Sequence, residues 1–328
     1  MVVGMKSSIM AIQNTQYPTV HNHSAARRSI AFTTPENYAA RLSHLLRLKG
    51  WAPLWCPTVL VQTTPHTKSS LLLHLSPPNP NPNPNPNPNN KPSLESYSAI
   101  AFTSRNGISA FSEALEDAVE PPLLQYGDVF TISALGKDSE LLNDAFIERI
   151  CENRKRIRVL VPKISTPGGI VEELGFGGGR RVLCPVPVVV GLEEPLVVPN
   201  FLRELESNGW VAVRVDAYET RWAGRECAGE VVARALGGRG GGEGGLDAVV
   251  FTSSAEVEGM LKSLGEYGLD WGRVKGKWPE LVVAAHGPVT AAGAERLGVG
   301  VDVVSERFAS FEGVVDALAL RWNKALEC

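Results

Sequence analysis

The chain has 328 residues, of which 44 % are hydrophobic, and a formal net charge of −3. This length is too great for one ordinary core and predicts two domains. The small negative charge argues against general nucleic-acid binding and against a basic membrane-binding patch, although a pocket could still bind a small anion. No run of about 18 apolar residues occurs, which excludes an ordinary transmembrane helix.

The first 35 residues contain no Asp or Glu, carry Lys6, Arg27 and Arg28, and are moderately rich in Ser and Thr. This composition is typical of a short organelle transit peptide, and it is equally compatible with a disordered cytosolic tail. We therefore expect residues 1–28 to be a tail or a transit-like segment.

A short apolar strand, a polar turn and an amphipathic helix recur along the chain. Strands alternating with helices at this spacing give parallel sheets in doubly wound α/β domains. The strands are expected at residues 29–32, 99–102, 248–251 and 281–285, with weaker copies at 129–134, 158–161 and 182–183.

Two segments of biased composition interrupt this pattern. Residues 77–92 are dominated by alternating Asn and Pro. Proline removes backbone donors and fixes φ, so we expect an extended loop here, with a role as a proline-rich ligand as the alternative. Residues 237–245 are rich in glycine and predict a flexible connector. They match GxGxxG only formally, because a dinucleotide-binding loop must follow a strand rather than precede one.

The polar turns after the strands have two interpretations. Thr34 before Pro35 predicts a helix N-cap, and Ser253 with Glu256 predicts a capping box. These residues would cap helices in any α/β protein. However, ligands of doubly wound sheets bind beyond the carboxyl ends of the strands, where helix N-termini favour negative charge. Turns from two domains would therefore form a cleft suited to carboxylates.

No metal site is expected from the spacing of histidines and cysteines. The six histidines lack HExxH or comparable spacing, and no CxxC joins the five cysteines. An odd, scattered set of cysteines indicates a reducing compartment. His286 lies at a strand end in a glycine-bearing turn, where it either contacts a ligand or is structural.

Taken together, these turns resemble those of uroporphyrinogen-III synthase. The ordered set is far more specific than any of its members, and it covers about residues 29–320 apart from the Asn-Pro insertion. The residues that carry the resemblance are 102–104 with Asn106, 218–220, 251–254, 284–291 and 308–318.

The resemblance implies two doubly wound parallel-sheet domains joined by a two-stranded linker. Residues 29–57 and 221–322 would form one discontinuous domain, residues 63–212 the other, and residues 58–62 and 213–220 the linker strands. The sequence supports a strand here, because Val211, Val213, Val215 and Ala217 recur at the two-residue period of a half-buried strand. This period predicts that Tyr218 faces the opposite way.

The resemblance also implies an activity. Such enzymes close hydroxymethylbilane to uroporphyrinogen III, invert its last ring and lose water, without cofactor or metal. Tyr218 matches the tyrosine favoured as the acid in this family, and a packing role is its alternative. The expected substrate-binding residues are Thr103, Ser104, Asn106, Ser139, Thr252, Ser253, Ser254, His286, Gly287 and Thr290.

The implied setting is haem and chlorophyll biosynthesis in the chloroplast, with the cytoplasm as the alternative. The expected partner is hydroxymethylbilane alone, bound by a monomer, with no nucleic acid and no membrane.

Some residues depart from the family pattern. Gly136-Lys137-Asp138-Ser139-Glu140 replaces a turn like Gly-x-x-Thr-Ala and adds two carboxylates, which would repel a polyanion unless they point away. Arg105 replaces a usual proline, and residues 185–195 are longer and more apolar than the short turn of the family. A non-catalytic two-domain module that closes on a small anion is therefore the main alternative, and a scaffold protein is another.

Overall fold

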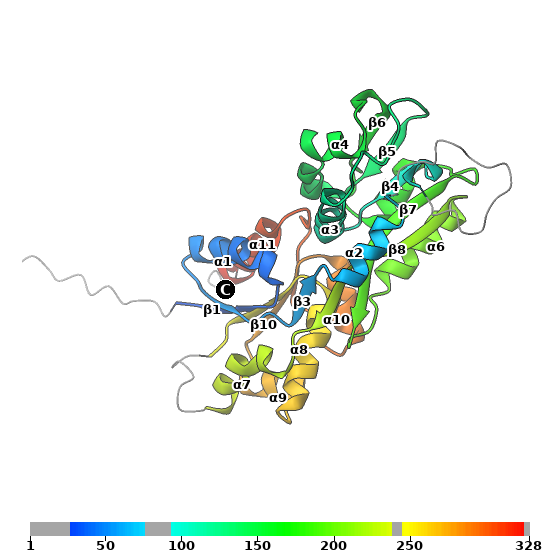
Figure 1. Cartoon of the computed structure of the whole chain (residues 1–328). Helices are drawn as coiled ribbons and strands as arrows, with labels where there is room; N and C mark the ends of the chain where they lie inside the picture. Colours follow the sequence, from blue (N-terminus) through cyan, green and yellow to red (C-terminus); the bar gives the residue numbers. More distant parts are fainter. Residues whose placement is uncertain (1–26, 76–92, 238–244, 325–328) are drawn as a thin grey trace, which may run out of the picture.

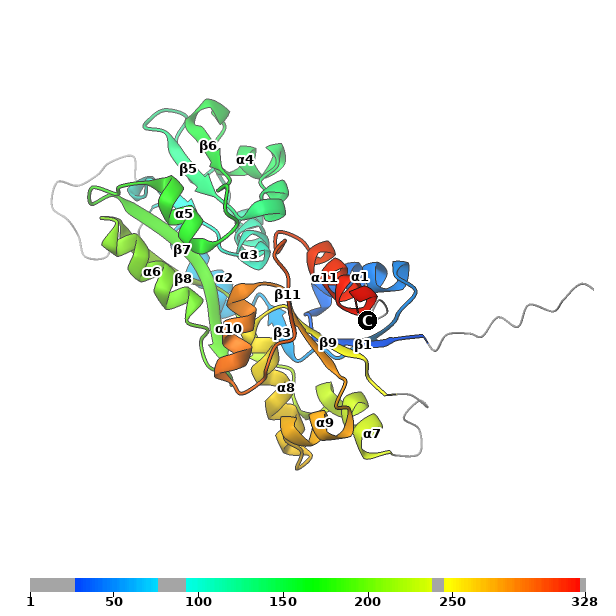
Figure 2. The same ribbon diagram turned by 180° about the vertical axis from the view of Figure 1, so that it is seen from behind.

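The computed structural model describes residues 27–75, 93–237 and 245–324. The tail, the Asn-Pro segment and nearly all of the glycine-rich connector therefore lie outside the described residues. The described part forms two units that follow each other along an elongated molecule (Figures 1 and 2).

A five-stranded parallel sheet forms the first unit, which combines the beginning of the described chain with its end. β1 lies between β2 and β9, and Ile30 is opposite both Pro53 and Ala248. The order is β11-β10-β9-β1-β2, with β1 at Ser29–Phe32, β2 at Ala52–Trp55, β9 at Ala248–Phe251, β10 at Val282–Ala285 and β11 at Val303–Val304.

Helices cover both faces of this sheet. Successive side chains of a strand point to opposite faces, so Ala31 joins one core while Ile30 and Phe32 join the other. The first core contains α7 (Gly229–Leu236), α8 (Ser254–Glu266), α9 (Trp271–Lys277) and α10 (Pro288–Arg296), and the second contains α1 (Glu36–Leu48) and α11 (Phe311–Lys324).

A six-stranded sheet forms the second unit and is also covered on both faces. Its order is β3-β8-β7-β4-β5-β6, with β3 at Val59–Gln62, β8 at Val211–Trp222, β7 at Arg181–Val190, β4 at Ala99–Ala101, β5 at Phe130–Ser133 and β6 at Ile157–Leu160. One face packs on α2 (Pro65–Leu72), α3 (Arg105–Glu116) and α4 (Asp144–Ile150), and the other on α5 (Pro167–Leu174) and α6 (Val197–Ser207). The predicted α/β class with two parallel-dominated sheets is confirmed.

The strand β8 departs from the predicted two-residue period. Asp216 is opposite Val186 and Tyr218 is opposite Pro187, so Ala217 is an extra residue without a partner on β7. Such a β-bulge re-aims the side chains that follow it. The prediction that Tyr218 faces away from Val215 and Ala217 is therefore wrong, because all three belong to one core.

Contacts at the linker strands and beyond β7 are among those that join the units. β3 runs antiparallel to β8 at the edge of the six-stranded sheet, in the segments expected to link the domains. Beyond β7, the backbone N–H of Glu193 donates to both oxygens of Glu258 on α8 at 2.9 Å. Lys262 of α8 donates to the Gly191 carbonyl at 2.9 Å, and Arg296 of α10 pairs with Glu193 at 3.0 Å. Most of the long apolar segment 185–195 is thus part of β7, and its last residues form interdomain contacts.

The cap predicted at Thr34 is wrong. α1 begins at Glu36, and Pro35 occupies the capping position with an extended ψ of 159° and no side-chain cap. Because Pro35 is outside the helix, Thr34 lies one position too early to reach the free N–H groups.

Within the described ranges, no helix has the length and apolar character needed to cross a membrane.

Candidate functional site

A cavity of about 640 Å³ lies between the two units. Its walls include the turns after β1, β4, β5, β9 and β10, as expected for ligand sites at the carboxyl ends of parallel strands. β3, β7 and β8 close it on the side of the linker. The cavity therefore gathers polar turns from both sheets.

Six helices begin at this cavity. Their capping or first residues form part of its wall: Pro35, Ser104, Pro167, Val197, Ser253 and Phe311. A helix N-terminus presents free N–H groups and the positive end of the helix dipole. The arrangement therefore favours anionic groups of a ligand, even though few cationic side chains line the wall.

Tyr218 reaches the cavity wall from β8. Its side chain is 6 % exposed, and its hydroxyl is 2.8 Å from Ser104 Oγ at the N-cap of α3. Burial raises the pKa of Tyr218 to about 12, and the hydrogen bond to Ser104 opposes this only in part. The phenol therefore stays protonated at neutral pH and can donate a proton.

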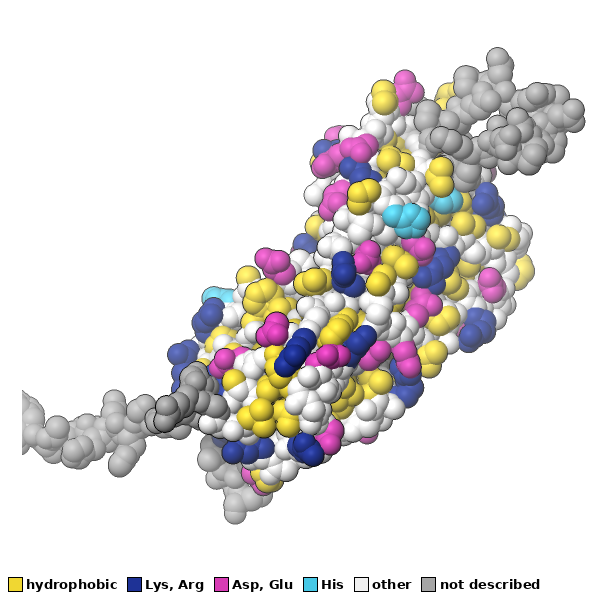
Figure 3. Space-filling view, turned by 60° about the horizontal axis from the view of Figure 1, so that its bottom comes forward, with side chains coloured by type: hydrophobic (Ala, Val, Ile, Leu, Met, Phe, Trp, Pro, Cys, Tyr) yellow, Lys and Arg dark blue, Asp and Glu magenta, His cyan; other side chains and the backbone are white. Residues whose placement is uncertain are grey.

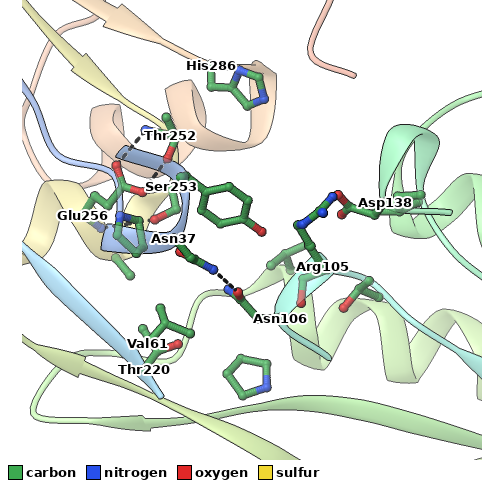
Figure 4. A pocket seen from close by; sticks show the side chains of 18 of the residues that line it. Asn37, Val61, Arg105, Asn106, Asp138, Thr220, Thr252, Ser253, Glu256 and His286 are labelled. Atoms are coloured by element: carbon green, nitrogen blue, oxygen red, sulfur yellow. Dashed lines mark hydrogen bonds between the residues drawn. The ribbon is translucent and has the colours of Figure 1, made fainter. Parts of the chain in front are cut away.

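The first Phe-Thr-Ser turn, residues 102–104, faces the cavity. Ser104 Oγ accepts the N–H of Gly107 at 3.2 Å and caps α3. Asn106 accepts a 2.7 Å hydrogen bond from Asn37 of α1 and so joins the two units across the cavity (Figure 4). Thr103, Ser104 and Asn106 all line the wall, as predicted.

The second Phe-Thr-Ser turn, residues 251–253, also lines the wall, but the hydrogen-bond donors of its threonine are already bonded to Glu256. The Glu256 carboxylate accepts hydrogen bonds from the Thr252 backbone at 2.9 Å and from the Thr252 hydroxyl (Figure 4). It also accepts one from the Thr33 hydroxyl at 2.6 Å. Burial raises the pKa of Glu256 despite these bonds. Ser253 Oγ accepts the backbone N–H of Glu256 at 3.3 Å, which is one of the two hydrogen bonds of a capping box. In the other, the Glu256 side chain would accept the backbone N–H of Ser253, but it accepts that of Thr252 instead. The predicted capping box is thus half formed.

Four of the predicted binding residues lie outside the cavity wall. Ser139 donates to the Gly136 carbonyl at 2.7 Å, and Thr290 donates to the Thr252 carbonyl at 3.0 Å. Ser254 packs against α10, where a Cβ at position 293 would lie only 2.4 Å from the Cβ of Ser254. Gly287 permits close approach, because a Cβ there would lie 2.9 Å from the Cβ of Phe308. These residues hold the turns in place.

His286 lines the wall on the side of the first unit. Its ring packs edge-on against Phe311 at 5.1 Å, and its Nδ1 is buried without a hydrogen-bond partner among the described residues. Burial lowers the pKa of His286, so the neutral ring predominates at neutral pH. A neutral imidazole with a free nitrogen can accept or donate one hydrogen bond to a ligand.

The sequence analysis missed several side chains that line the cavity: Tyr38, Arg41, Arg105, Lys137 and Asp138. Asp138 and Glu140 do not point away from the cavity. Burial raises the pKa of Asp138, and the charge of the neighbouring Arg105 opposes this (Figure 4). The sequence did carry one sign of this pair. Arg105 replaces a proline of the family pattern, and the cation it adds accompanies the added carboxylate of Asp138.

In the ranges described, no group of three His, Cys, Asp or Glu side chains could hold a metal ion. On the face shown in Figure 3, acidic and basic side chains are interspersed.

Comparison with known proteins identifies a family. The model described as "Uroporphyrinogen-III synthase HemD" matches residues 40–315. No curated protein matches the chain significantly.

Solved structures show related chain paths. A mutant uroporphyrinogen III synthase of Thermus thermophilus is 16 % identical with a TM-score of 0.48, and the match covers 92 % of this chain and 99 % of that one. The uroporphyrinogen-III synthetase of Helicobacter pylori is 14 % identical with a TM-score of 0.45, with 90 % and 99 % covered.

Proposed function

Because the chain belongs to the uroporphyrinogen-III synthase family, we propose that it closes hydroxymethylbilane to uroporphyrinogen III, inverting the last ring and losing water. The observation that carries this proposal is the interdomain cavity with six helix N-termini in its wall. Such a wall suits a ligand with many carboxylates, because an N-terminus that the protein leaves free can accept one without a dedicated cation. The turn before α8 is the exception, since Glu256 already accepts the hydrogen bonds of Thr252.

Positioning supplies most of the proposed effect. The hydroxyl must leave, and the chain of four pyrroles must be folded so that the substituted carbon of its last ring attacks the resulting cation. Holding reacting groups together in this way can lower a barrier by about 7–11 kcal/mol. Turns from both units surround the cavity, so both would grip the carboxylates while the ends of the substrate meet.

Tyr218 is the proposed acid for the departure of water. Its phenol is protonated at neutral pH, and its position on the bulged strand β8 fixes it against Ser104 in the wall. The hydrogen bond to Ser104 orients the ring while the cavity side remains available to the substrate. Arg105 and Lys137 would bind carboxylates of the substrate and offset Asp138 and Glu140.

Separating the isomers of the product tests the proposal. The pure protein is incubated with hydroxymethylbilane, and uroporphyrinogens I and III are separated after oxidation. We expect isomer III in excess over a protein-free control, which closes without inversion. Isomer I alone, together with saturable binding of the bilane, would identify the chain as a non-catalytic binding module instead.

The proposed setting is a monomer in the chloroplast that supplies haem and chlorophyll synthesis. The acid-free composition of the first 35 residues supports this location. The location is tested by import of the full chain into isolated chloroplasts. The monomeric state is tested separately by the mass of the protein in solution.

A further inference from the structure

Tyr38 brings a second phenol to the cavity, from the unit opposite Tyr218. It lies in the first turn of α1 and lines the wall. Its ring packs edge-on against Phe311 of α11, with centroids 5.9 Å apart and planes at 88°. This contact fixes the ring, because edge-to-face aromatic pairs have a defined geometry.

The hydroxyls of the two tyrosines differ in their partners. The Tyr218 hydroxyl is bonded to Ser104 Oγ at 2.8 Å and is almost fully buried. The Tyr38 hydroxyl makes no hydrogen bond within the described residues, although its side chain is half-buried at the cavity wall. A half-buried phenol without a protein partner can donate its proton to a ligand without first breaking an internal bond.

The charged groups of the site act on the hydroxyl of Tyr38. Burial raises the pKa of Tyr38, the nearby Asp138 and Tyr218 raise it further, and Arg105 lowers it. The phenol is therefore protonated at every physiological pH. Arg105 is the cation that would stabilise a phenolate formed there for a short time.

We propose that Tyr38 donates a proton to the hydroxyl that leaves hydroxymethylbilane, sharing the acid role with Tyr218. This inference rests on the proposed function. The C–O bond of the hydroxymethyl group breaks, and the oxygen leaves as water with the phenol proton. The bilane becomes an azafulvene cation beside the phenolate. The proton that the last ring loses when the macrocycle closes returns to the phenolate, so the net loss is one water.

The two phenols approach the same cavity from different units, and this explains why two donors are useful. The leaving hydroxyl is at one end of a long flexible substrate, whose ends must meet before closure. A donor on α1 and a donor on β8 bracket the place where they meet, so a proton is available from either unit.

The test compares Tyr38→Phe, Tyr218→Phe and the double variant. Phe keeps the ring that packs against Phe311 and removes only the hydroxyl. With hydroxymethylbilane, we expect kcat of Tyr38→Phe to fall at least ~10-fold with a smaller change in KM, and the double variant to fall below either single variant. Tyr126→Phe is the matched control, because Tyr126 is 76 % exposed and lies outside the cavity wall.

A second substrate separates proton donation from a structural role. A bilane whose hydroxymethyl group is acetylated loses acetate, which needs no proton. Tyr38→Phe should turn over this substrate within about 2-fold of the parent if the hydroxyl acts only as an acid. Parental kcat of Tyr38→Phe with hydroxymethylbilane, or an equal loss with both substrates, would overturn the inference while the proposed function stands. A parent that makes no uroporphyrinogen III would overturn both.

Discussion

The two Phe-Thr-Ser turns of this protein have the same local sequence, but one is open to the cavity and the other is closed by a protein side chain. Residues 102–104 and residues 251–253 each end a strand with a buried Phe and cap the next helix with Ser. In both, the serine hydroxyl accepts the N–H three positions later, at 3.2 Å and 3.3 Å. The backbone and the cap are therefore equivalent.

The difference lies four residues after the threonine. This position is Glu256 in the second turn and Gly107 in the first. Glu256 binds the N–H and hydroxyl of Thr252 and crosses to Thr33, so the second turn is closed by the protein itself. Gly107 has no side chain, and Thr103 stays open to the cavity. Of the two turns, the first therefore leaves its threonine free for a ligand, and the second does not.

Removing Glu256 should have the largest effect on stability. Glu256→Ala leaves the hydroxyl and the backbone N–H of Thr252 without an acceptor, and the Thr33 hydroxyl keeps only the Val250 carbonyl at 3.2 Å. We expect the free energy of unfolding to fall by about 3 kcal/mol or more. Chemical denaturation measures this, with Glu266→Ala on the exposed face of the same helix as the control. A loss below about 1 kcal/mol would mean that the second turn is not held by Glu256.

Equivalent threonine substitutions should separate the two turns. Thr103→Val is expected to weaken substrate binding by about 1–3 kcal/mol, through a lost hydrogen bond to a carboxylate, with little change in stability. Thr252→Val should cost about 1–2 kcal/mol of stability with a nearly unchanged KM. KM and the unfolding midpoint of both variants check this. The same response from both would contradict the contrast between an open and a closed turn.

The positive charge of Arg105 beside the open turn should make KM depend on salt concentration. Arg105→Gln is expected to raise KM several-fold at low salt, which corresponds to about 1 kcal/mol of binding free energy. The difference from the parent should shrink at high salt, because ions screen a half-exposed charge. Lys155→Gln, on a basic residue remote from the cavity wall, serves as the control. An unchanged KM would remove Arg105 from substrate binding.

The smallest effect concerns the closed turn and pH. Burial raises the pKa of Glu256 above its ordinary value of 4.5, so the folded state binds more protons than the unfolded state between these two pKa values. The free energy of unfolding should therefore fall as pH rises from about 4.5 through the folded pKa, and this fall should be absent in Glu256→Gln. Parallel curves for parent and variant would show that Glu256 does not titrate in this range.

The sequence predicted the sheets well, because their strands are short apolar runs bounded by polar turns. It also predicted the seven site residues that line the cavity, since each follows a strand or lies on β8. Ser139 and Thr290 were chosen by the same rule, but their hydroxyls bond to nearby carbonyls. Local sequence does not show whether a hydroxyl will face a ligand or the backbone.

Two features could not be predicted from local pattern. The bulge at Ala217 has no glycine or proline on β8 to mark it, although Pro187 lies opposite on β7 at the register shift. The bulge reverses the face expected for Tyr218. Tyr38 lies one helical turn before Leu42 on the apolar stripe of α1, where a core position is expected, and Arg41 is at an exposed position, which usually faces water. They face the cavity because a second unit stands opposite α1, and this arrangement depends on contacts such as that between Asn37 and Asn106.

The pairing of β1 with β9 has a consequence during synthesis. The Ser29 backbone donates to Asp247, 218 positions later, and Ile30 pairs with Ala248. At about 5–20 residues per second, a ribosome needs roughly 10–45 s to make the intervening chain. Within that time β1 can pair with β2 but leaves its other edge open, while the six-stranded sheet can already form. An unpaired apolar strand edge invites association with other chains, so a nascent-chain chaperone that binds residues 29–55 should raise the yield of folded protein.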